Sequence, residues 1–350
     1  MSDLLDPKID FVFSQMAPFL KRNRPIKLGG IGNGRIQKDK LTSKKGDLPI
    51  YLYREDGTRG EDHMLVLEND QFKQREDVQI DPEDRGYQFG DGIYEVIRVY
   101  DGQPFLLGEH IERLVRSARE IKLPLPLSAE KLEGKVTELI AQAGSSSTGV
   151  TNATGNVYVQ ITRGVAPRTH QFPKNPQPKL IGYFIPAERP HTAMANGIKA
   201  ITAPDIRWLR CDIKSLNLLG SALAKQEAVE RGCQEAILHR DEVVTEGSST
   251  NVFIVTDGML RTHPANHLIL HGITRATVRQ CAEQLNLHVS EAPFTLRELL
   301  AADEVFITGT TVEISPVIEI DARPIGNGSP GPVTRRLQQA FAELIDQGVK

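Results

Sequence analysis

The stretch Cys211-Asp212-Ile213-Lys214-Ser215-Leu216-Asn217 lies between a strand-like segment and a helix-like segment, and it carries a lysine. Further along, Val244-Thr245-Glu246-Gly247-Ser248-Ser249-Thr250-Asn251 lies among short strand-like segments and carries a glutamate. The first stretch therefore supplies one amine, Lys214, and the second supplies one carboxylate, Glu246. We interpret these two groups as candidates for a shared site.

Lys214 and Glu246 together indicate the chemistry of an aldehyde cofactor. A lysine amine forms a Schiff base with such an aldehyde, and an acid against a pyridine nitrogen keeps that nitrogen protonated, so that the ring can accept electrons. For a lysine or a turn glutamate taken alone, a solvated surface charge is the ordinary interpretation. The pair predicts pyridoxal 5′-phosphate as the cofactor when it is combined with the motifs below.

Strands and helices alternate around the two segments. Apolar alternation predicts strands at residues 64–67, 93–99, 157–162, 198–203, 235–238, 251–255, 304–307 and 317–320. Apolar side chains at helical spacing predict helices at residues 109–116, 129–143, 218–231, 274–285 and 295–301. This mixture of hairpins and separated helices predicts an α+β (mixed α/β) fold, and not a doubly wound parallel sheet.

Changes in composition along the chain predict three parts. Residues 1–61 are rich in lysine and glycine, and we expect a flexible N-terminal extension there. Residues 62–188 are expected to form a smaller α/β domain. Residues 189–350 are expected to form a larger domain that binds the cofactor, after a linker at residues 186–191.

Composition excludes several classes of function. The chain has 350 residues, of which 39% are hydrophobic and 25% charged, which is typical of a soluble enzyme. A net charge of -3 gives no reason to expect nucleic acid or an anionic membrane as a partner. No apolar run is long enough to span a membrane, and acidic residues near the N-terminus are unlike a signal peptide. Three cysteines without close spacing predict a reduced, cytoplasmic location.

Several motifs occur in a fixed order along the chain. They are Asp84-Arg85-Gly86-Tyr87-Gln88-Phe89-Gly90-Asp91-Gly92-Ile93-Tyr94-Glu95, His110-Ile111-Glu112-Arg113-Leu114, Lys214, Glu246 and Gly272-Ile273-Thr274-Arg275. As an ordered set they resemble the class IV pyridoxal-phosphate aminotransferases, and within that class the D-amino acid aminotransferases. The resemblance runs from near His63 to the C-terminus, and it implies fold type IV, with two domains and the cofactor in the cleft between them.

The resemblance gives the candidate residues their roles. Lys214 would form the Schiff base and would then carry the proton between the substrate α-carbon and the cofactor. Glu246 would contact the pyridine nitrogen. For the cofactor phosphate, the resemblance implies donors from four positions, Arg113, Ile273, Thr274 and Thr310. The chain departs from the family at Gly309, where the D-amino acid enzymes carry serine, so that one expected hydroxyl group is missing.

Substrate choice depends on the loop of residues 163–173, which contains an Arg-x-His pair. In the family, Arg168 and His170 would come from the neighbouring subunit and would bind the substrate α-carboxylate together with Tyr94 of the subunit that holds the cofactor. A homodimer follows from this arrangement. The side of the cofactor that takes the carboxylate decides which enantiomer presents its α-hydrogen to Lys214, so these residues favour D-substrates.

The expected reaction is transamination between a D-amino acid, with D-alanine as the expected donor, and 2-oxoglutarate, giving the 2-oxo acid and D-glutamate. A branched-chain L-aminotransferase and an aminodeoxychorismate lyase would also keep Lys214 and Glu246. Outside the enzymes, the same fold would serve as a non-catalytic cofactor-binding protein. The Arg168-x-His170 pair argues against the branched-chain alternative.

Three histidines, His263, His267 and His271, have the spacing of metal ligands on a helix. Because Pro264-Ala265-Asn266 is typical of a turn, we do not expect that helix, and no metal is predicted.

Overall fold

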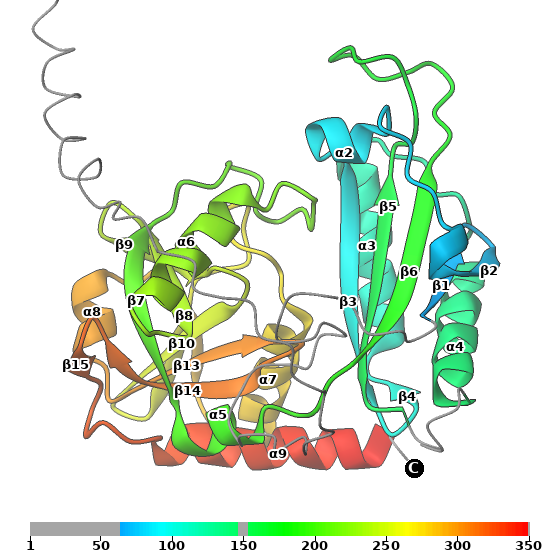
Figure 1. The fold of residues 1–350 in the computed structure, drawn as a ribbon. Coiled ribbons are helices and arrows are strands. Elements are labelled where there is room, and N and C mark those ends of the chain that lie inside the picture. The colour runs from blue at the N-terminus through cyan, green and yellow to red at the C-terminus, as the bar shows by residue number, and fades with distance from the viewer. Residues whose placement is uncertain (1–63, 146–152, 349–350) are drawn as a thin grey trace, which may run out of the picture. The chain divides into compact units, whose positions relative to one another are not determined.

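The structure is a computed structural model that describes residues 64–145 and 153–348 (Figure 1). All of these residues fall within one compact unit. The N-terminal extension expected at residues 1–61 lies outside the described residues.

The first sheet has six strands in the order β2-β1-β6-β5-β3-β4, and every neighbouring pair is antiparallel. Its strands are β1 (Leu65–Glu68), β2 (Gln71–Gln74), β3 (Gly92–Tyr100), β4 (Gln103–Pro104), β5 (Gly155–Thr162) and β6 (Lys179–Pro186). The helices of this part are η2 (Arg75–Asp77), α2 (Arg85–Phe89), α3 (Leu107–Glu120) and α4 (Ala129–Ser145).

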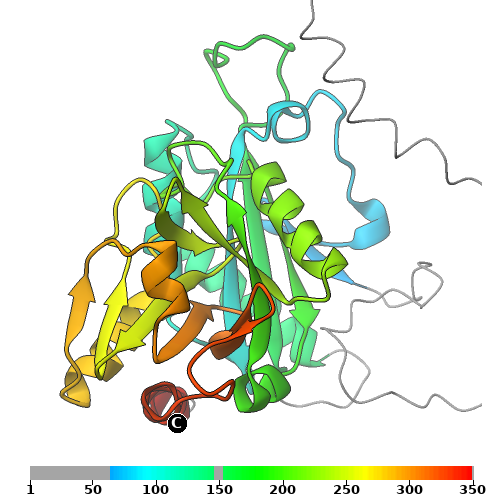
Figure 2. The ribbon, with the colours of Figure 1, turned by 90° about the vertical axis from the view of Figure 1, so that its left-hand side faces the viewer.

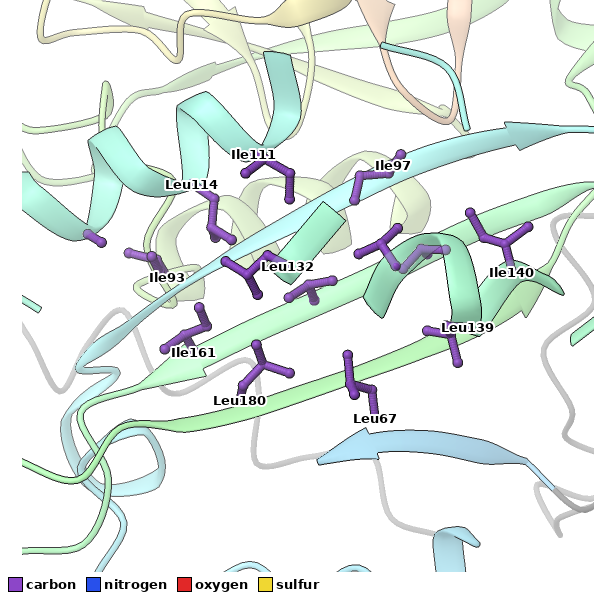
Figure 3. Packing of buried hydrophobic residues seen from close by; sticks show 14 of the residues in the cluster. Leu67, Ile93, Ile97, Ile111, Leu114, Leu132, Leu139, Ile140, Ile161 and Leu180 are labelled. Atoms are coloured by element: carbon purple, nitrogen blue, oxygen red, sulfur yellow. The ribbon is translucent and has the colours of Figure 1, made fainter. Parts of the chain in front are cut away.

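Strand β3 turns alternate side chains to opposite faces of this sheet, as the period of a strand requires. Ile93 and Ile97 face α3 and α4, where they pack with Ile111 and Leu114 in a buried cluster (Figure 3). Each fully buried side chain of this kind contributes about 1.5–3 kcal/mol to the hydrophobic stabilisation. The opposite face of β3 carries Tyr94 and the residues that follow it at every second position.

The second sheet has nine strands in the order β12-β11-β10-β13-β14-β7-β8-β9, with β15 paired to β14. Its strands are β7 (Ile198–Pro204), β8 (Glu235–Arg240), β9 (Val243–Gly247), β10 (Asn251–Thr256), β11 (Met259–Thr262), β12 (Val289–Glu291), β13 (Glu304–Gly309), β14 (Glu313–Ile320) and β15 (Arg323–Pro324). Parallel pairs, β11 with β12, β14 with β7 and β7 with β8, occur beside antiparallel ones. The predicted mixture of sheet types is therefore confirmed.

Five helices accompany the second sheet: α5 (His191–Asn196), α6 (Leu219–Glu230), α7 (Ile273–Gln284), α8 (Leu296–Leu300) and α9 (Pro332–Gly348). Helix α9 lies below the strands in Figure 1 and is seen end-on in Figure 2. Its buried residues Leu337 and Phe341 pack with Phe253 and Phe306 of the sheet. This contact covers one face of the sheet.

The stretch of residues 211–217 joins the second sheet to β3. The Leu216 amide donates to the Gly92 carbonyl at 3.0 Å, and the Tyr94 amide donates to the Lys214 carbonyl at 3.0 Å. Because these bonds fix the backbone of Lys214 against the beginning of β3, they position the lysine beside Tyr94.

Our sequence-based predictions omit α2, β6 and α9, as well as the short elements β2, β4, α5, β9, β11, β12 and β15. In α2 the Asp84 side chain accepts the Gly86 amide at 2.7 Å, and Gly90 ends the helix with a φ of 65°. Because the cap Asp84 and the terminating Gly90 are only six positions apart, the helix has five residues, which is too short for a periodic signal. Strand β6 has buried and half-buried residues in succession, so that simple alternation is weak.

Candidate active site

Lys214 lies in a segment without regular secondary structure, and its backbone is held on both sides. Its amide donates to the Ser117 hydroxyl of α3 at 3.3 Å, and its carbonyl accepts the Tyr94 amide. The Lys214 Nζ atom lies 4.4 Å from the centroid of the Tyr94 ring. With the backbone fixed in this way, movement is left to the side chain.

A pocket surrounds this amine. Tyr94, Lys214 and Glu246, three of the residues predicted for the site, line it together. The turn of residues 248–250, between β9 and β10, lines it as well. The amine and the carboxylate that are 32 positions apart in the sequence therefore share one pocket.

Glu246 is a buried carboxylate with donors on both of its oxygens. Arg207 Nη1 donates to Oε1 at 2.6 Å, and Asn251 Nδ2 donates to Oε2 at 2.9 Å. The Leu270 amide lies 3.0 Å from Oε2 and 3.2 Å from Oε1. Three donors from three separate segments thus fix the orientation of this carboxylate.

Burial raises the pKa of Glu246 to about 7, although the Arg207 guanidinium and the Leu270 amide act in the opposite direction. Arg207 is also engaged by Asp205, which accepts from its Nε at 2.8 Å and from its Nη2 at 2.9 Å. Because Arg207 also binds Asp205, its positive charge does not fully neutralise the Glu246 carboxylate. A cationic group bound against it would favour its ionised form.

This raised pKa leads to a prediction about stability. Between the pKa of an unfolded glutamate, about 4.3, and the folded value, the unfolded chain releases a proton that folded Glu246 retains. Glu246 therefore makes its full contribution to the free energy of unfolding below about pH 4. That contribution falls by on the order of 3 kcal/mol as the pH rises to the folded pKa, about 7. Urea unfolding of the cofactor-free protein between pH 5 and pH 8 measures this fall. Glu246→Gln, which does not titrate, should lack it, and equal slopes for the two proteins would contradict the prediction.

Arg113 belongs to an ion cluster between α3 and β3. Its Nε and Nη2 atoms donate to the two oxygens of Glu95 at 2.7 and 2.8 Å, and His110 Nδ1 lies 2.8 Å from Glu95 Oε2. Arg113 Nη1 donates to the His271 carbonyl at 3.1 Å. The Arg113 guanidinium holds the pKa of Glu95 well below its usual range in spite of complete burial. Arg113 and Ile273 line a second depression, separate from the pocket of Lys214.

The other residues predicted for a phosphate lie at two chain turns. Helix α7 begins at Ile273 after Gly272, which gives it no side-chain cap, so the amides of Ile273 and Thr274 point out of the helix start. Thr310 follows β13 directly. At Gly309, a Cβ atom would lie 3.3 Å from Val312 Cγ2 and 3.6 Å from Thr250 Cγ2. The close approach of Val312 to this position fits the glycine found there.

Arg168 and His170 are exposed, and they are absent from the described residues that line the Lys214 pocket. Both contact Phe89, with the Arg168 Cζ atom 5.2 Å from the ring centroid and the His170 ring 5.9 Å from it. Arg85 also binds the loop of residues 163–173, since its Nη1 atom donates to the Thr169 carbonyl at 2.6 Å. Phe89 and Arg85 thus contact the Arg-x-His segment, which does not line the pocket of its own chain.

The three histidines with metal-like spacing do not lie on a helix, because the segment from His263 to His271 consists of turns and extended chain. His263 Nδ1 lies 3.0 Å from the Pro264 carbonyl, and His271 Nε2 lies 3.1 Å from the Asn266 carbonyl. Two of the rings are therefore used to fold this turn.

Sequence reasoning did not identify Arg207, Asn251 or Glu95 as parts of the site. Arg207 precedes the Lys214 segment by only a few residues, but its contact with Glu246 spans 39 positions of the chain. For Glu95, a signal was present, because His110 and Arg113 are three residues apart on α3 and present two nitrogen-bearing side chains to one acid.

Comparison with known proteins identifies relatives over most of the chain. The family model described as "Amino-transferase class IV" matches residues 92–320. A D-alanine aminotransferase of Bacillus licheniformis is 48% identical over 282 residues, which are 81% of this chain and 97% of the relative.

Two solved structures have the same fold. The branched-chain amino acid aminotransferase of Escherichia coli matches with a TM-score of 0.75 and 29% identity, over 81% of this chain and 95% of that one. The branched-chain amino acid aminotransferase of Thermobaculum terrenum in its PLP form matches with a TM-score of 0.70 and 27% identity, over 80% and 93% of the two chains. Since the family model covers more than half of the residues, this chain belongs to the class IV aminotransferases.

Proposed function

We propose that this protein is a pyridoxal-phosphate-dependent aminotransferase that transfers the amino group of D-alanine to 2-oxoglutarate, giving pyruvate and D-glutamate. The observation that carries the proposal is that the Lys214 amine and the buried Glu246 carboxylate line one pocket. The relative named D-alanine aminotransferase is 48% identical to this chain, whereas the two structural neighbours named branched-chain aminotransferases are 29% and 27% identical. This difference favours D-alanine over a branched-chain substrate.

The residues of the pocket and the amides at the start of α7 fit pyridoxal phosphate. Glu246 is a buried acid that calls for a cationic partner, as a protonated pyridine nitrogen is. The free amides at the start of α7 suit a phosphate dianion, because the helix dipole is positive at that end. When bound, the cofactor supplies an aldehyde carbon and a ring that withdraws electrons from the substrate α-carbon.

Lys214 has two tasks in this proposal. Its Nζ atom would hold the cofactor aldehyde and, after the substrate amine has bound, would move the proton at the substrate α-carbon. The bonds from Lys214 to Ser117 and Tyr94 fix its backbone, so that the amine moves on a fixed base. Glu246, ionised and held by three donors, keeps the ring nitrogen protonated throughout.

For the phosphate, we propose Arg113 together with the amides of Ile273 and Thr274 and the Thr310 residue. A guanidinium has five N–H groups. Glu95 and the His271 carbonyl engage three of those of Arg113, so that within the described residues two remain for the phosphate. Glu95 thus holds the arginine in place rather than competing for all of it.

The α-carboxylate of the substrate is assigned to Tyr94 and to Arg168 and His170 of a second subunit. Large apolar side chains are exposed on the stretches before and after the Lys214 segment of the single chain, a feature that marks interaction surfaces. They are Ile206 (66% exposed), Trp208 (41%), Leu209 (62%), Leu218 (41%), Leu219 (74%) and Leu223 (53%). Of these, Trp208 and Leu218 also line the pocket. A homodimer that covers this surface would bring a second copy beside each Lys214.

A complementation experiment tests the exchange of the Arg168 loop between subunits. Arg168→Ala is expected to lower kcat/KM for D-alanine by about 30- to 100-fold, because a charge-assisted contact to the carboxylate is lost. Lys214→Ala is expected to be inactive. In a mixed dimer, one site combines the intact Lys214 of one subunit with the intact Arg168 of the other. Random reassortment of the two variants should therefore restore about a quarter of the wild-type activity, since a C₂ dimer has two equivalent sites.

The control for this experiment is each variant unfolded and refolded alone, which should remain at its own low activity. A mixture that stays at the average of the two variants would place the loop and the lysine of one site in the same subunit. A chain that is fully active while sedimenting as a monomer would remove the dimer altogether.

One assay tests the proposed reaction itself. Purified enzyme with cofactor is given each of a panel of D- and L-amino acids with 2-oxoglutarate, and D- and L-glutamate are separated on a chiral column. We expect D-glutamate and pyruvate from D-alanine. Turnover of L-leucine to L-glutamate without turnover of D-alanine would support the branched-chain alternative. Release of pyruvate from aminodeoxychorismate in the absence of 2-oxoglutarate would support the lyase.

We further propose a cytoplasmic enzyme with two domains, residues 62–188 and 189–350, and the cofactor between them. The three cysteines, Cys211, Cys233 and Cys281, are free, which suits a reduced compartment. Among the helices of the described residues, none combines the length and the apolar character needed to cross a membrane.

A further inference from the structure

Arg98 of β3 is a buried cation with unused hydrogen-bond donors. Its side chain is only 2% exposed, and its Nη1 atom donates weakly to Asn156 Oδ1 at 3.4 Å. Its Nε and Nη2 atoms have no hydrogen-bond partner within the described residues. Because buried polar groups are nearly always paired, two open donors on one arginine call for an explanation.

Arg98 lies on the face of β3 that carries the site. Side chains alternate along a strand, so Arg98 shares its face with Tyr94 and Tyr100. Tyr94 lies under the Lys214 amine, while Tyr100 is part of the core formed with Phe341. Arg98 is therefore on the same side of the sheet as Tyr94, although among the described residues it is not one of those that line the Lys214 pocket.

The charges around Arg98 do not neutralise it. Glu313 lies near enough to raise the pKa of Arg98, as does Tyr100, although burial lowers that pKa overall. Glu313, however, is bound on both oxygens by Arg189, at 2.9 Å to Nε and 2.7 Å to Nη2. Two arginines thus face one acid, and Arg98 is the cation in excess.

Glu313 also relates the position of Arg98 to the turn that contains Thr310. It begins β14 directly after residues 309–312, the turn that contains Thr310. Arg98 and Arg189 both lie against the Tyr100 ring, with their Cζ atoms 5.2 and 5.4 Å from its centroid. Because Arg189 binds Glu313, this shared contact brings the Arg98 guanidinium near the end of this turn. Arg98 is therefore flanked by Tyr94 along its own strand and by the Thr310 turn from the second sheet.

We propose that Arg98 binds the distal carboxylate of dicarboxylic substrates, 2-oxoglutarate and D-glutamate. This inference rests on the proposed function. Both amino-group donors and acceptors have an α-carboxylate, which Tyr94, Arg168 and His170 take, so a second carboxylate needs a second cation. The open Nε and Nη2 donors of Arg98 lie on one edge of the guanidinium, which is the edge that matches two carboxylate oxygens side by side.

The same arrangement accommodates D-alanine. With a methyl side chain the substrate does not reach Arg98, whose remaining donors are then left to water. Arg98 would thus raise the affinity for dicarboxylates without excluding the small substrate. It is a specificity-determining residue in this proposal and takes no part in the proton transfer.

Two substitutions and a matched control test the inference. In Arg98→Gln, the KM for 2-oxoglutarate and for D-glutamate should rise by about 10- to 100-fold, because the buried charge-assisted pair is lost. Exchange of amino groups between D-alanine and pyruvate should stay within about threefold. Arg98→Lys keeps the positive charge but loses the two parallel donors of the guanidinium. Compared with Arg98→Gln, it should restore part of the dicarboxylate affinity. Arg297→Gln, at an exposed position of α8, should leave both substrate pairs unchanged.

A measurement on the wild-type holoenzyme covers the case in which Arg98 variants do not fold. Glutarate and butyrate, which carry neither an amino nor an oxo group, are compared by the shift of the thermal unfolding midpoint, since a ligand of the folded state stabilises it. Glutarate should give the larger shift and bind at least about tenfold more tightly. Equal shifts for the two acids would contradict the proposal.

The outcomes separate this inference from the proposed function. If wild-type enzyme exchanges amino groups between D-alanine and 2-oxoglutarate but Arg98→Gln affects the dicarboxylate and monocarboxylate pairs equally, only the role of Arg98 is wrong. A folded Arg98→Gln variant with unchanged kinetics for both pairs has the same meaning. If the wild-type enzyme does not transaminate D-amino acids at all, the proposed function itself has failed.

Discussion

Lys214→Ala is expected to lower the rate of D-alanine transamination by at least about 10⁴-fold, because one substitution removes both the covalent anchor and the proton carrier. The surroundings should remain folded, since the contacts of Lys214 that fix the segment are made by its backbone. The direct measurement is borohydride reduction followed by peptide mapping. Wild-type enzyme should carry the reduced cofactor on Lys214, and the variant should carry none.

Two controls accompany this variant. Lys131→Ala, at an exposed position of α4, removes the same side chain elsewhere and should be fully active. Added methylamine should restore part of the activity of Lys214→Ala, because a free amine can occupy the space of the lost side chain and move the proton. Reduced cofactor found on another lysine, with Lys214→Ala still active, would overturn the assignment of the site.

Glu246→Gln is expected to give the second largest effect, a decrease in kcat of about 10²- to 10³-fold. Glutamine keeps the size of the side chain and an acceptor for Arg207, but it has no charge to hold a ring nitrogen protonated. Its amide group would also face the Asn251 and Leu270 donors, which now point at a carboxylate oxygen. A donor turned toward donors costs about 1–3 kcal/mol.

Separate measurement of turnover and cofactor binding distinguishes these effects. Because the phosphate is assigned to other residues, Glu246→Gln should still bind the cofactor, as judged by its visible absorption after gel filtration, while single-turnover proton removal slows. Glu246→Asp retains the charge on a shorter side chain and should recover part of the rate. A Glu246→Gln enzyme within about threefold of wild type would mean that the ring nitrogen depends on another group.

Much of the architecture could be predicted because its signals are local. Strand β3 and helix α3 follow from apolar residues at periods of 2 and 3.6, and β7, α6 and α7 follow in the same way. The C-terminal helix α9 carries Leu337, Phe341 and Ile345 at helical spacing, so its signal was also present in the sequence although our predictions omit it. The edges of the second sheet, β9 and β12, are short strands, and such segments give weak periodicity.

The contacts that tune the site could not be predicted in the same way. Arg207 and Leu270, which hold Glu246, are 39 and 24 positions from it. Such distances depend on the register between strands and on the path of irregular segments, and neither has a sequence period. The unpaired donors of Arg98 are still harder to predict from the sequence, since they depend on the contact between Arg189 and Glu313.

The sequence by itself determined the mixed fold, the class IV family and the choice of Lys214 and Glu246. Periodicity and reactive side-chain types can be recognised within short segments of the chain. Only the tertiary structure decided that these two groups share a pocket, that burial raises the pKa of Glu246 to about 7, and that Arg168 is exposed and does not line the pocket of its own chain. Burial and electrostatic partnership are properties of the space around a residue, and that space is filled by residues far away in the sequence.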